Sequence, residues 1–429
     1  MCELMDDGNE ILRQIRELVK EYFARQARGR FEPGITRIPL IAPSYGWEEV
    51  AEAIDSLLTT KVTMGEKVRQ FESMFADYIG VNHATMVNSG SSANLLALSV
   101  LTNPMTKNRI KPGDEIITPA VTWATTVWPI INCGAVPVLV DVNLDTFNIN
   151  PDEVKKATTA RTRAIMLVHL LGNPCDMDRI MEMARTNDVY IIEDACEAHG
   201  AEFQGQKVGS FGNLATFSFF FSHHISTIEG GIVLTNDEEF AELTKALRVF
   251  GWVRDLKDKN KIAQRYKNID PRYLFLNIGY NFRPTELQGA FGIHQLEKLD
   301  TFIDIRQQNA KFWAENLSEY EDYLLIHNNK EGTRHVWFGY PLTVKPGAPF
   351  TREQLTDFLE KRGVETRPVM AGNIDEQPAM NLFTYRKVGD LPNSRLIMRN
   401  SFFIGNHQGI GSAEREAVVD YVREFLSMH

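Results

Sequence analysis

Short apolar runs that alternate with helical patterns constrain this fold more than any other feature of the sequence. Between residues 84 and 236 the chain reads ATMVNSG, EIITPA, PVLVDV, RAIMLVHLL, VYIIEDA, ATFSFFF and GGIVLTN, with helical segments such as Asp176 to Asn187 between them. Strands that alternate with helices form a mostly parallel sheet with both faces covered. The sequence therefore predicts an α/β fold built on such a sheet.

Helical spacing also marks the two ends of the chain. Apolar residues recur every three or four positions over residues 9–28, which predicts an amphipathic helix followed by an arm. After Tyr280 the pattern predicts one long helix, or two in series, that leads to an α+β segment. We therefore expect an N-terminal helix and arm over residues 1–45, a large cofactor-binding domain over 46–300 and a small C-terminal domain over 301–429.

Charge and cysteine content exclude several classes of function. The net charge is −10 over 429 residues and no run of Lys and Arg stands out, which argues against a nucleic-acid surface. The four cysteines have no CxxC spacing, which indicates a reducing compartment and no structural zinc. The N-terminus lacks a signal-peptide pattern, and no apolar stretch reaches the roughly 18 residues of a membrane span. We therefore expect a cytoplasmic enzyme that binds neither nucleic acid nor membrane.

Two segments carry groups suited to a phosphorylated aromatic ligand. In NSGSSANL, Asn88 to Leu95, small residues between a strand and a helix leave backbone N–H groups free to hold a phosphate; a plain serine cap is the alternative. In TPAVTWATT, Thr118 to Thr126, Trp123 is a candidate stacking surface for an aromatic ring or else a core tryptophan.

Two further segments place polar groups at the ends of predicted elements. YIIEDACEAHGA ends an apolar strand in adjacent acids, and Asp194 could pair with the protonated ring nitrogen of a pyridine cofactor. A surface turn or helix cap is the alternative, but ligand sites of α/β sheets lie at strand ends. In GYNFRPTELQGA, Asn281 and Arg283 could bind an anion or cap the following helix.

The segment FSFFFSHHISTIEGG, residues 217–231, carries an unusual pair of side chains. Two glycines end a strand-like aromatic run, as they do around the reactive lysine of many pyridoxal phosphate (PLP) enzymes. Here the stretch contains two histidines and no lysine. The alternative is a core strand whose histidines are structural.

Together these segments, in this order and spacing, resemble the DegT/DnrJ/StrS family of nucleotide-sugar enzymes, and the resemblance covers nearly the whole chain. It implies the PLP-dependent transferase fold type I (aspartate aminotransferase-like). It also implies a set of cofactor-binding residues: Gly90, Ser91 and Ser218 at the phosphate, Trp123 on the pyridine ring and Asp194 at its nitrogen. Asn281 of the partner subunit would complete the phosphate site, which implies a homodimer with a shared active site.

The departures from the family pattern are informative. The family's aminotransferases carry lysine six residues before the acid of the EGG motif; because Glu229 is that acid, the position is His223. The nearest lysines, Lys207 and Lys245, do not match, and Glu197 stands where a glutamine is usual. These two departures, and the segment AGNIDEQP at residues 371–378, resemble a small branch of the family. That branch consists of 3-dehydratases that act on nucleotide-linked 4-keto-6-deoxyhexoses and use pyridoxamine phosphate (PMP), in colitose-type and ascarylose-type synthesis.

The N-terminal helix and arm are more similar to the ascarylose type, which holds a [2Fe–2S] cluster on cysteines and needs a reductase. Here Cys196 is the last cysteine of the chain, whereas four thiolates are the usual requirement. We therefore predict no iron–sulfur cluster, no metal site and no partner reductase. Glutamate would instead regenerate PMP from PLP, as the colitose-type resemblance implies.

Histidine in place of lysine has a chemical consequence. A lysine amine would hold PLP covalently and release product by transimination, whereas imidazole forms no such stable link, so the cofactor can stay as PMP. Histidine titrates at about 6.5, close to operating pH, and suits a base. We assign His223 as the base and His224 to structure, because neighbouring strand residues point to opposite faces. Ser222 is a candidate to assist proton transfer.

The sequence thus predicts PMP-dependent C3 dehydration of a nucleotide-linked 4-keto-6-deoxyhexose, a step of deoxysugar biosynthesis. Glu197 would lie near the ring hydroxyl, and the branch resemblance suggests Arg367 and Asn373 as substrate contacts. The alternatives are a PLP-dependent sugar aminotransferase, a cofactor-binding regulator without activity, and a cluster-free enzyme of the ascarylose branch with a different PMP reaction.

Overall fold

The computed structural model describes residues 2–26 and 29–429; residues 27 and 28, the last two positions of the predicted N-terminal helix, lie outside the described residues. In the described part, eight strands form one large sheet. Their order is β1 (His83–Val87), β9 (Gly231–Thr235), β8 (Leu214–Ser218), β5 (Tyr190–Asp194), β4 (Thr162–Val168), β2 (Glu115–Pro119), β3 (Val136–Val140) and β14 (Arg386–Lys387). Neighbours from β8 to β14 pair in parallel, and β9 pairs antiparallel with β1 and β8. The prediction of a mostly parallel sheet is confirmed.

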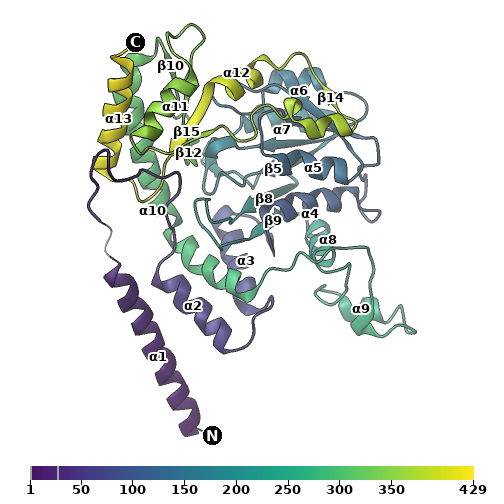
Figure 1. The fold of residues 1–429 in the computed structure, drawn as a ribbon. Coiled ribbons are helices and arrows are strands. Elements are labelled where there is room, and N and C mark those ends of the chain that lie inside the picture. Colours follow the sequence, from purple (N-terminus) through teal and green to yellow (C-terminus); the bar gives the residue numbers. More distant parts are fainter. Residues whose placement is uncertain (1, 27–28) are drawn as a thin grey trace.

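Helices cover both faces of this sheet (Figure 1). The helices are α1 (Cys2–Arg25), α2 (Trp47–Leu58), α3 (Glu66–Ile79), α4 (Gly90–Thr102), α5 (Ala124–Asn132), α6 (Pro151–Ala157), α7 (Met177–Asn187), α8 (Glu238–Arg248), α9 (Lys259–Ala263), α10 (Glu286–Leu317), α11 (Arg352–Lys361), α12 (Pro392–Asn400) and α13 (Ser412–Leu426). Successive strand residues face opposite sides, so Ile192 of β5 packs with α4, α5 and α8, whereas Ile191 packs with α6 and α7. Helices α3 and α10 cover the same side as α6 and α7, over β8 and β9.

Smaller sheets and turns complete the fold. One sheet contains β10 (Leu324–Ile326), β12 (Gly339–Val344), β15 (Ser401–Gly405) and β13 (Thr366–Pro368); the other contains β11 (Thr333–Arg334), β6 (Glu202–Phe203) and β7 (Gln206–Lys207). The 3-10 helices are η1 (Leu170–Gly172), η2 (Pro271–Tyr273), η3 (Ser318–Tyr320), η4 (Ile374–Glu376) and η5 (Pro378–Leu382). Helix α10 is one continuous helix that crosses residue 300, so the predicted domain division there stays a prediction.

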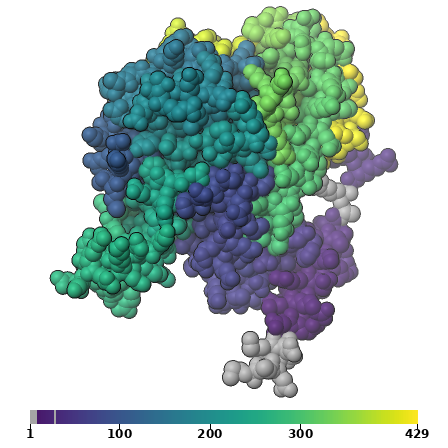
Figure 2. Space-filling view, turned by 180° about the vertical axis from the view of Figure 1, so that it is seen from behind, coloured from purple at the N-terminus to yellow at the C-terminus, as the bar shows by residue number. Residues whose placement is uncertain are grey.

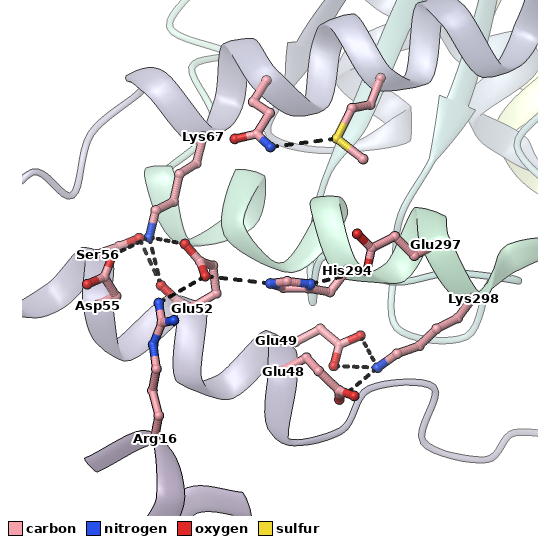
Figure 3. A network of polar contacts seen from close by, with 12 residues as sticks. Arg16, Glu48, Glu49, Glu52, Asp55, Ser56, Lys67, His294, Glu297 and Lys298 are labelled. Carbon is pink, nitrogen blue, oxygen red and sulfur yellow. Dashed lines mark hydrogen bonds and ion pairs between the residues drawn. The ribbon is translucent and has the colours of Figure 1, made fainter. Parts of the chain in front are cut away.

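A polar network joins α1, α2, α3 and α10 (Figure 3). Glu52 of α2 lies 2.7 Å from Lys67 Nζ of α3 and 3.5 Å from His294 Nε2 of α10. Arg16 of α1 lies 3.4 Å from the same carboxylate. The hydrogen bond from His294 and the charge of Lys67 lower the pKa of Glu52 to about 2, although burial acts in the opposite direction. The network therefore ties the N-terminal helix to the body of the molecule.

The segment between α8 and α10, which contains α9 and η2, projects from the body (Figures 1 and 2). It exposes large apolar side chains: Tyr266, Ile269, Tyr273, Phe275 and Ile278. Over residues 2–26 and 29–429, no helix combines the length and apolar character that a membrane span requires.

Candidate active site

A cavity of about 410 Å³ opens where β5 and β8 end. Most of the predicted site residues line it: Gly90, Ser91, Trp123, Asp194, Glu197, Ser218, His223 and Arg367. Its apolar wall is formed by Val168, Phe220, Phe338, Pro368, Met370 and Phe403. The carboxyl ends of parallel strands meet at one edge of a sheet, so residues far apart in the sequence converge there.

The N-terminus of α4 carries the segment NSGSSANL; the structure shows the serine cap, and the phosphate cradle stays a prediction. Ser89 caps the helix, since its Oγ accepts from the backbone N–H of Ser92 at 3.1 Å. The N–H groups of Gly90 and Ser91 have no intrahelical acceptor and remain available to an anion. A Cβ atom at Gly90 would lie 2.4 Å from Cβ of Ser218. Only glycine therefore lets the helix end approach the end of β8 this closely.

Asp194 is buried at the end of β5 and rigidly held. Its Oδ2 accepts from Asn94 Nδ2 at 2.8 Å and from Thr126 Oγ1 at 2.7 Å, and Asn94 Oδ1 accepts from Thr216 Oγ1 at 2.5 Å. Among the described residues Asp194 has no ion pair, although a buried carboxylate usually has a cationic partner. A protonated pyridine nitrogen would supply that partner, so the site fits the cofactor.

The neighbouring acid has a different role because strand residues alternate. Glu193 points to the opposite face, where it accepts from the backbone N–H groups of Gly209, Phe211 and Gly212 at 2.7–2.8 Å. His169 Nε2 lies 3.1 Å from its carboxylate. Glu193 therefore fixes a turn, and of the two adjacent acids Asp194 faces the cavity.

Trp123 and Glu197 lie on two sides of the cavity. Trp123 precedes α5 and is 50% exposed, so it is a wall of the cavity and not a core residue. Glu197 accepts from the backbone N–H of Leu171 at 2.7 Å. Burial raises the pKa of Glu197 to about 8; the Leu171 bond opposes this shift and the charge of Asp194 adds to it. At neutral pH the carboxyl group is therefore mostly protonated and able to donate a hydrogen bond.

The two histidines differ in environment, but not for the reason that the sequence suggested. Strand β8 ends at Ser218 and residues 221–225 form turns, so strand alternation does not separate the two side chains. His223 lines the cavity, whereas His224 is fully buried and its Nε2 donates to the carbonyl of Val336 at 2.9 Å. The assignment of His224 to structure agrees with these contacts.

The expectation that His223 titrates near its ordinary value is wrong. Burial, and then the charge of Arg306, lower the pKa of His223 to about 3. Its ring packs 5.3 Å from that of Phe338. Its Nδ1 is enclosed without a hydrogen-bond partner among the described residues, so Nε2 is the nitrogen left to face the cavity. His223 is thus neutral at all near-neutral pH values.

Lysine is absent from the cavity wall formed by the described residues. Lys207 Nζ lies over the ring of Tyr78, 4.7 Å from its centroid, and Lys245 pairs with Glu242 at 2.9 Å. Neither amine can reach a ligand held between Asp194 and Trp123 without leaving these contacts.

Of the remaining predicted residues, Arg367 lies on the cavity wall, whereas Asn373 and Asn281 do not. Arg367 of β13 is exposed on the cavity wall, and no described residue pairs with it. Asn373 is fully buried outside the wall; its Oδ1 accepts from the N–H of Asp375 at 3.3 Å and caps η4, so its predicted contact with substrate is not supported. Asn281 is exposed away from this cavity and accepts from Arg283 Nε at 2.9 Å.

Sequence reasoning missed the residues that hold the site. Asn94 and Thr126 fix Asp194, and the charge of Arg306 acts on both His223 and His224. A signal existed for Asn94, because it is a polar residue in the apolar helical run NLLALSVL. Arg306 gave no local signal, since its site contacts lie in other segments of the chain.

The cysteines with described side chains, Cys133, Cys175 and Cys196, are free thiols. Burial, with the nearby charge of Asp194, raises the pKa of Cys196 well above its usual range, so this thiol is not a thiolate at neutral pH. Within the described residues, no group of three or more His, Cys, Asp and Glu side chains is arranged to hold a metal ion.

The fold and site define a type I PLP-fold protein whose cavity has an imidazole where an amine is usual. Residues 43–423 match the model of the DegT/DnrJ/EryC1/StrS aminotransferase family, and the chain belongs to this family. It is 40% identical to GDP-4-keto-6-deoxy-D-mannose 3-dehydratase of Yersinia pseudotuberculosis, over 86% of this chain and 94% of that protein. It is 38% identical to dTDP-4-dehydro-2,6-dideoxy-D-glucose 3-dehydratase of Saccharopolyspora spinosa, over 99% and 94%. A crystal structure of GDP-4-keto-6-deoxymannose-3-dehydratase with a trapped PLP-glutamate geminal diamine superposes with a TM-score of 0.84 at 37% identity, over 90% of this chain and 99% of that one.

Proposed function

We propose that the protein is a PMP-dependent 3-dehydratase of a nucleotide-linked 4-keto-6-deoxyhexose, with glutamate as the amine source. The observation that carries this proposal is the cavity itself: His223 stands beside the cradle, the buried acid and the exposed tryptophan, and the wall has no lysine in the described chain. The names of the relatives support the same reaction class.

The cavity residues divide the work of binding. The N–H groups of Gly90 and Ser91 and the hydroxyl of Ser218 would hold the phosphate, Trp123 would cover one face of the ring, and the carboxylate of Asp194 would pair with the ring nitrogen; all five residues line the cavity. Protonated Glu197 would donate to the ring hydroxyl. These are the roles of the cofactor-binding set.

When bound, the cofactor supplies a primary amine for the sugar ketone and a pyridine ring that accepts electrons. His223 Nε2 receives one proton and delivers it to the C3 hydroxyl, which leaves as water. The phenyl rings of Phe220 and Phe338 also line the cavity, with centroids 6.4 and 5.3 Å from that of the His223 ring. Arg367, the cation on the wall without a described partner, binds an anionic group of the nucleotide sugar or of glutamate.

The proposal includes a homodimer. Asn281 is exposed, faces away from this chain's cavity and lies at the base of the projecting apolar segment. The partner's copy would complete each cavity at the phosphate. Sedimentation analysis should give twice the chain mass of 48.8 kDa.

The test is a panel of GDP-, CDP-, dTDP- and UDP-linked 4-keto-6-deoxyhexoses, each incubated with PMP and glutamate. The expected products are a 3-deoxy sugar and 2-oxoglutarate, detected by mass spectrometry. A 4-amino sugar would instead establish an aminotransferase. A lysine trapped on PLP by borohydride would refute the assignment of His223 as the replacement for that amine. Cofactor binding without turnover on any panel member would favour a regulator.

A further inference from the structure

Arg306 of α10 is a buried cation without an acidic partner. Its side chain is 3% exposed, and among the described residues no carboxylate pairs with it. Its Nη1 donates to the carbonyls of Trp337 at 3.2 Å, Phe338 at 3.0 Å and Asn406, while Nε has no partner. Burial lowers its pKa to about 9, so it remains cationic at neutral pH. A buried charge that is not paired is costly and calls for an explanation.

The segment 336–338 connects this cation to the histidines. Phe338, whose carbonyl accepts from Arg306, packs its ring 5.3 Å from His223 and 6.0 Å from His224. The carbonyl of Val336 accepts from His224. The segment 336–338 therefore contacts both the guanidinium and the imidazoles, and Arg306 is not among the residues that line the cavity.

His223 lacks the partner that strengthens most histidine bases. A base histidine usually donates from its second nitrogen to a carboxylate, which stabilises the protonated ring. Here Nδ1 is enclosed without a partner in the described chain, and the charge that acts on the ring is that of a cation, Arg306. Both features work against a protonated ring.

Several elements bring charged or titratable groups to the cavity or to His223. They are His224 on its own turn, Asp194 at the end of β5, Cys196, Glu197 and His199 after it, Glu229 before β9, and Arg306 of α10. The acids of this set line the cavity side and favour a protonated imidazole. His199 is fully buried among Phe75, Phe217 and Phe219, and adds no negative charge. Arg306 is thus the group that opposes the cavity acids.

We infer that Arg306 is a positioning residue that acts through His223: its unpaired guanidinium keeps the imidazole from retaining a proton, so that a proton taken at Nε2 passes at once to the leaving C3 hydroxyl. The inference rests on the proposed dehydration for its purpose. In that step Nε2 gains one proton and loses it to the hydroxyl oxygen as the C3–O bond breaks, and water leaves. An imidazolium beside a fixed cation is a stronger acid, which favours the second transfer.

The test measures the titration of His223 directly. The PMP-loaded protein is labelled with ¹³C/¹⁵N-histidine and followed by NMR against pH, with the His223 signals assigned by their loss in His223→Asn. We expect a midpoint well below about 6.5 in the unchanged protein. Arg306→Gln should raise it by about one pH unit or more, the effect of one adjacent charge. Arg306→Lys, which keeps a cation, should raise it less.

Arg415→Gln is the matched control, because Arg415 is also partly buried with an unpartnered Nε but stacks on Phe312 of α10. It should leave the midpoint unchanged. An unchanged midpoint in folded Arg306→Gln would overturn the inference. If that variant does not fold, a midpoint at or above about 6.5 in the unchanged protein overturns it equally. If the protein catalysed no dehydration but the midpoints were as expected, the proposed function would be refuted, whereas the effect of Arg306 on His223 would be supported.

Discussion

Replacing Gly90 by alanine tests the proposed phosphate cradle. The added methyl group favours the helix but crowds Ser218, and these two effects oppose each other. A Cβ atom there would lie 2.4 Å from Cβ, 2.8 Å from Oγ and 3.1 Å from Cα of Ser218. Because the last of these atoms belongs to the backbone of Ser218, a rotamer change cannot relieve the crowding. Helix α4 or strand β8 must therefore shift at the point where both are proposed to hold the phosphate.

The destabilisation expected from crowding is larger than the stabilisation expected from helix propensity. Alanine in place of glycine stabilises a helix interior by at most ~1 kcal/mol. Overpacking of a well-packed site costs about 1–3 kcal/mol. We expect a net loss of about 1–2 kcal/mol in the PMP-bound protein, which corresponds to about five- to thirty-fold in an equilibrium constant. If the N-terminus of α4 moves away from Ser218, the loss appears as weaker cofactor binding. If it stays in place, the crowding lowers the free energy of unfolding.

The assay combines calorimetric titration of PMP with thermal unfolding at a fixed PMP concentration. Gly8→Ala in α1 is the control, since a Cβ atom at Gly8 has no neighbour within 4 Å, and it should lose nothing. Ser218→Gly removes the clashing Cβ, whereas Ser218→Ala keeps it, and both lose the hydroxyl. Gly90→Ala should therefore cost less in the Ser218→Gly background than in the Ser218→Ala background. Unchanged affinity and stability in Gly90→Ala would refute the close approach.

The ionisable groups lead to three more predictions. His223→Asn should abolish 3-deoxy product while PMP affinity stays within about threefold of the unchanged protein; loss of PMP binding would make His223 structural. Because the pKa of Glu197 is raised from 4.5 to about 8, its contribution to stability is complete below pH 4.5 and is lost as pH rises through 8. Denaturant unfolding should thus show a decline of stability across this window that Glu197→Gln lacks; equal pH profiles would contradict the shift. The hydrogen bond to Glu52 raises the pKa of His294 above 6.5, so its contribution is complete below pH 6.5 and lost as pH rises through the raised value. His294→Gln should remove that decline, and its persistence would assign it to another group.

The positions of strands along the chain and the acid at the end of β5 could be predicted because both are local properties of the sequence. Apolar runs of five to seven residues gave β2, β4 and β5, and the acid at the end of β5 is Asp194. The single reversed strand, β9, was not predicted, since its direction depends on its neighbours and not on its own residues.

The electrostatic state of the site could not be predicted from the sequence. The pKa of His223 depends first on burial and then on the charge of Arg306, which is 83 positions away in the numbering. Asn373 was misjudged for the opposite reason: its motif is local, but its side chain is used to cap η4. Burial and long-range contacts decide what an ionisable residue does, and neither is a property of its neighbours in sequence.

Two backbone hydrogen bonds at Leu171 connect Glu197 to the segment that packs against His223. The N–H of Phe338 donates to Leu171 at 2.8 Å, and the N–H of Leu171 donates to Glu197 at 2.7 Å. Leu171 and Trp337 both have left-handed backbone, with φ of 52° and 49°. Such residues cost about 1–3 kcal/mol each and persist where the surrounding structure fixes them. Here the two residues lie in the segments that contact the site: Leu171 donates to Glu197, and Trp337 precedes Phe338, which contacts both Arg306 and His223. Because Leu171 contacts both Glu197 and the segment that carries Phe338, a shift of Leu171 would change the surroundings of the Glu197 carboxyl group and of the His223 imidazole together.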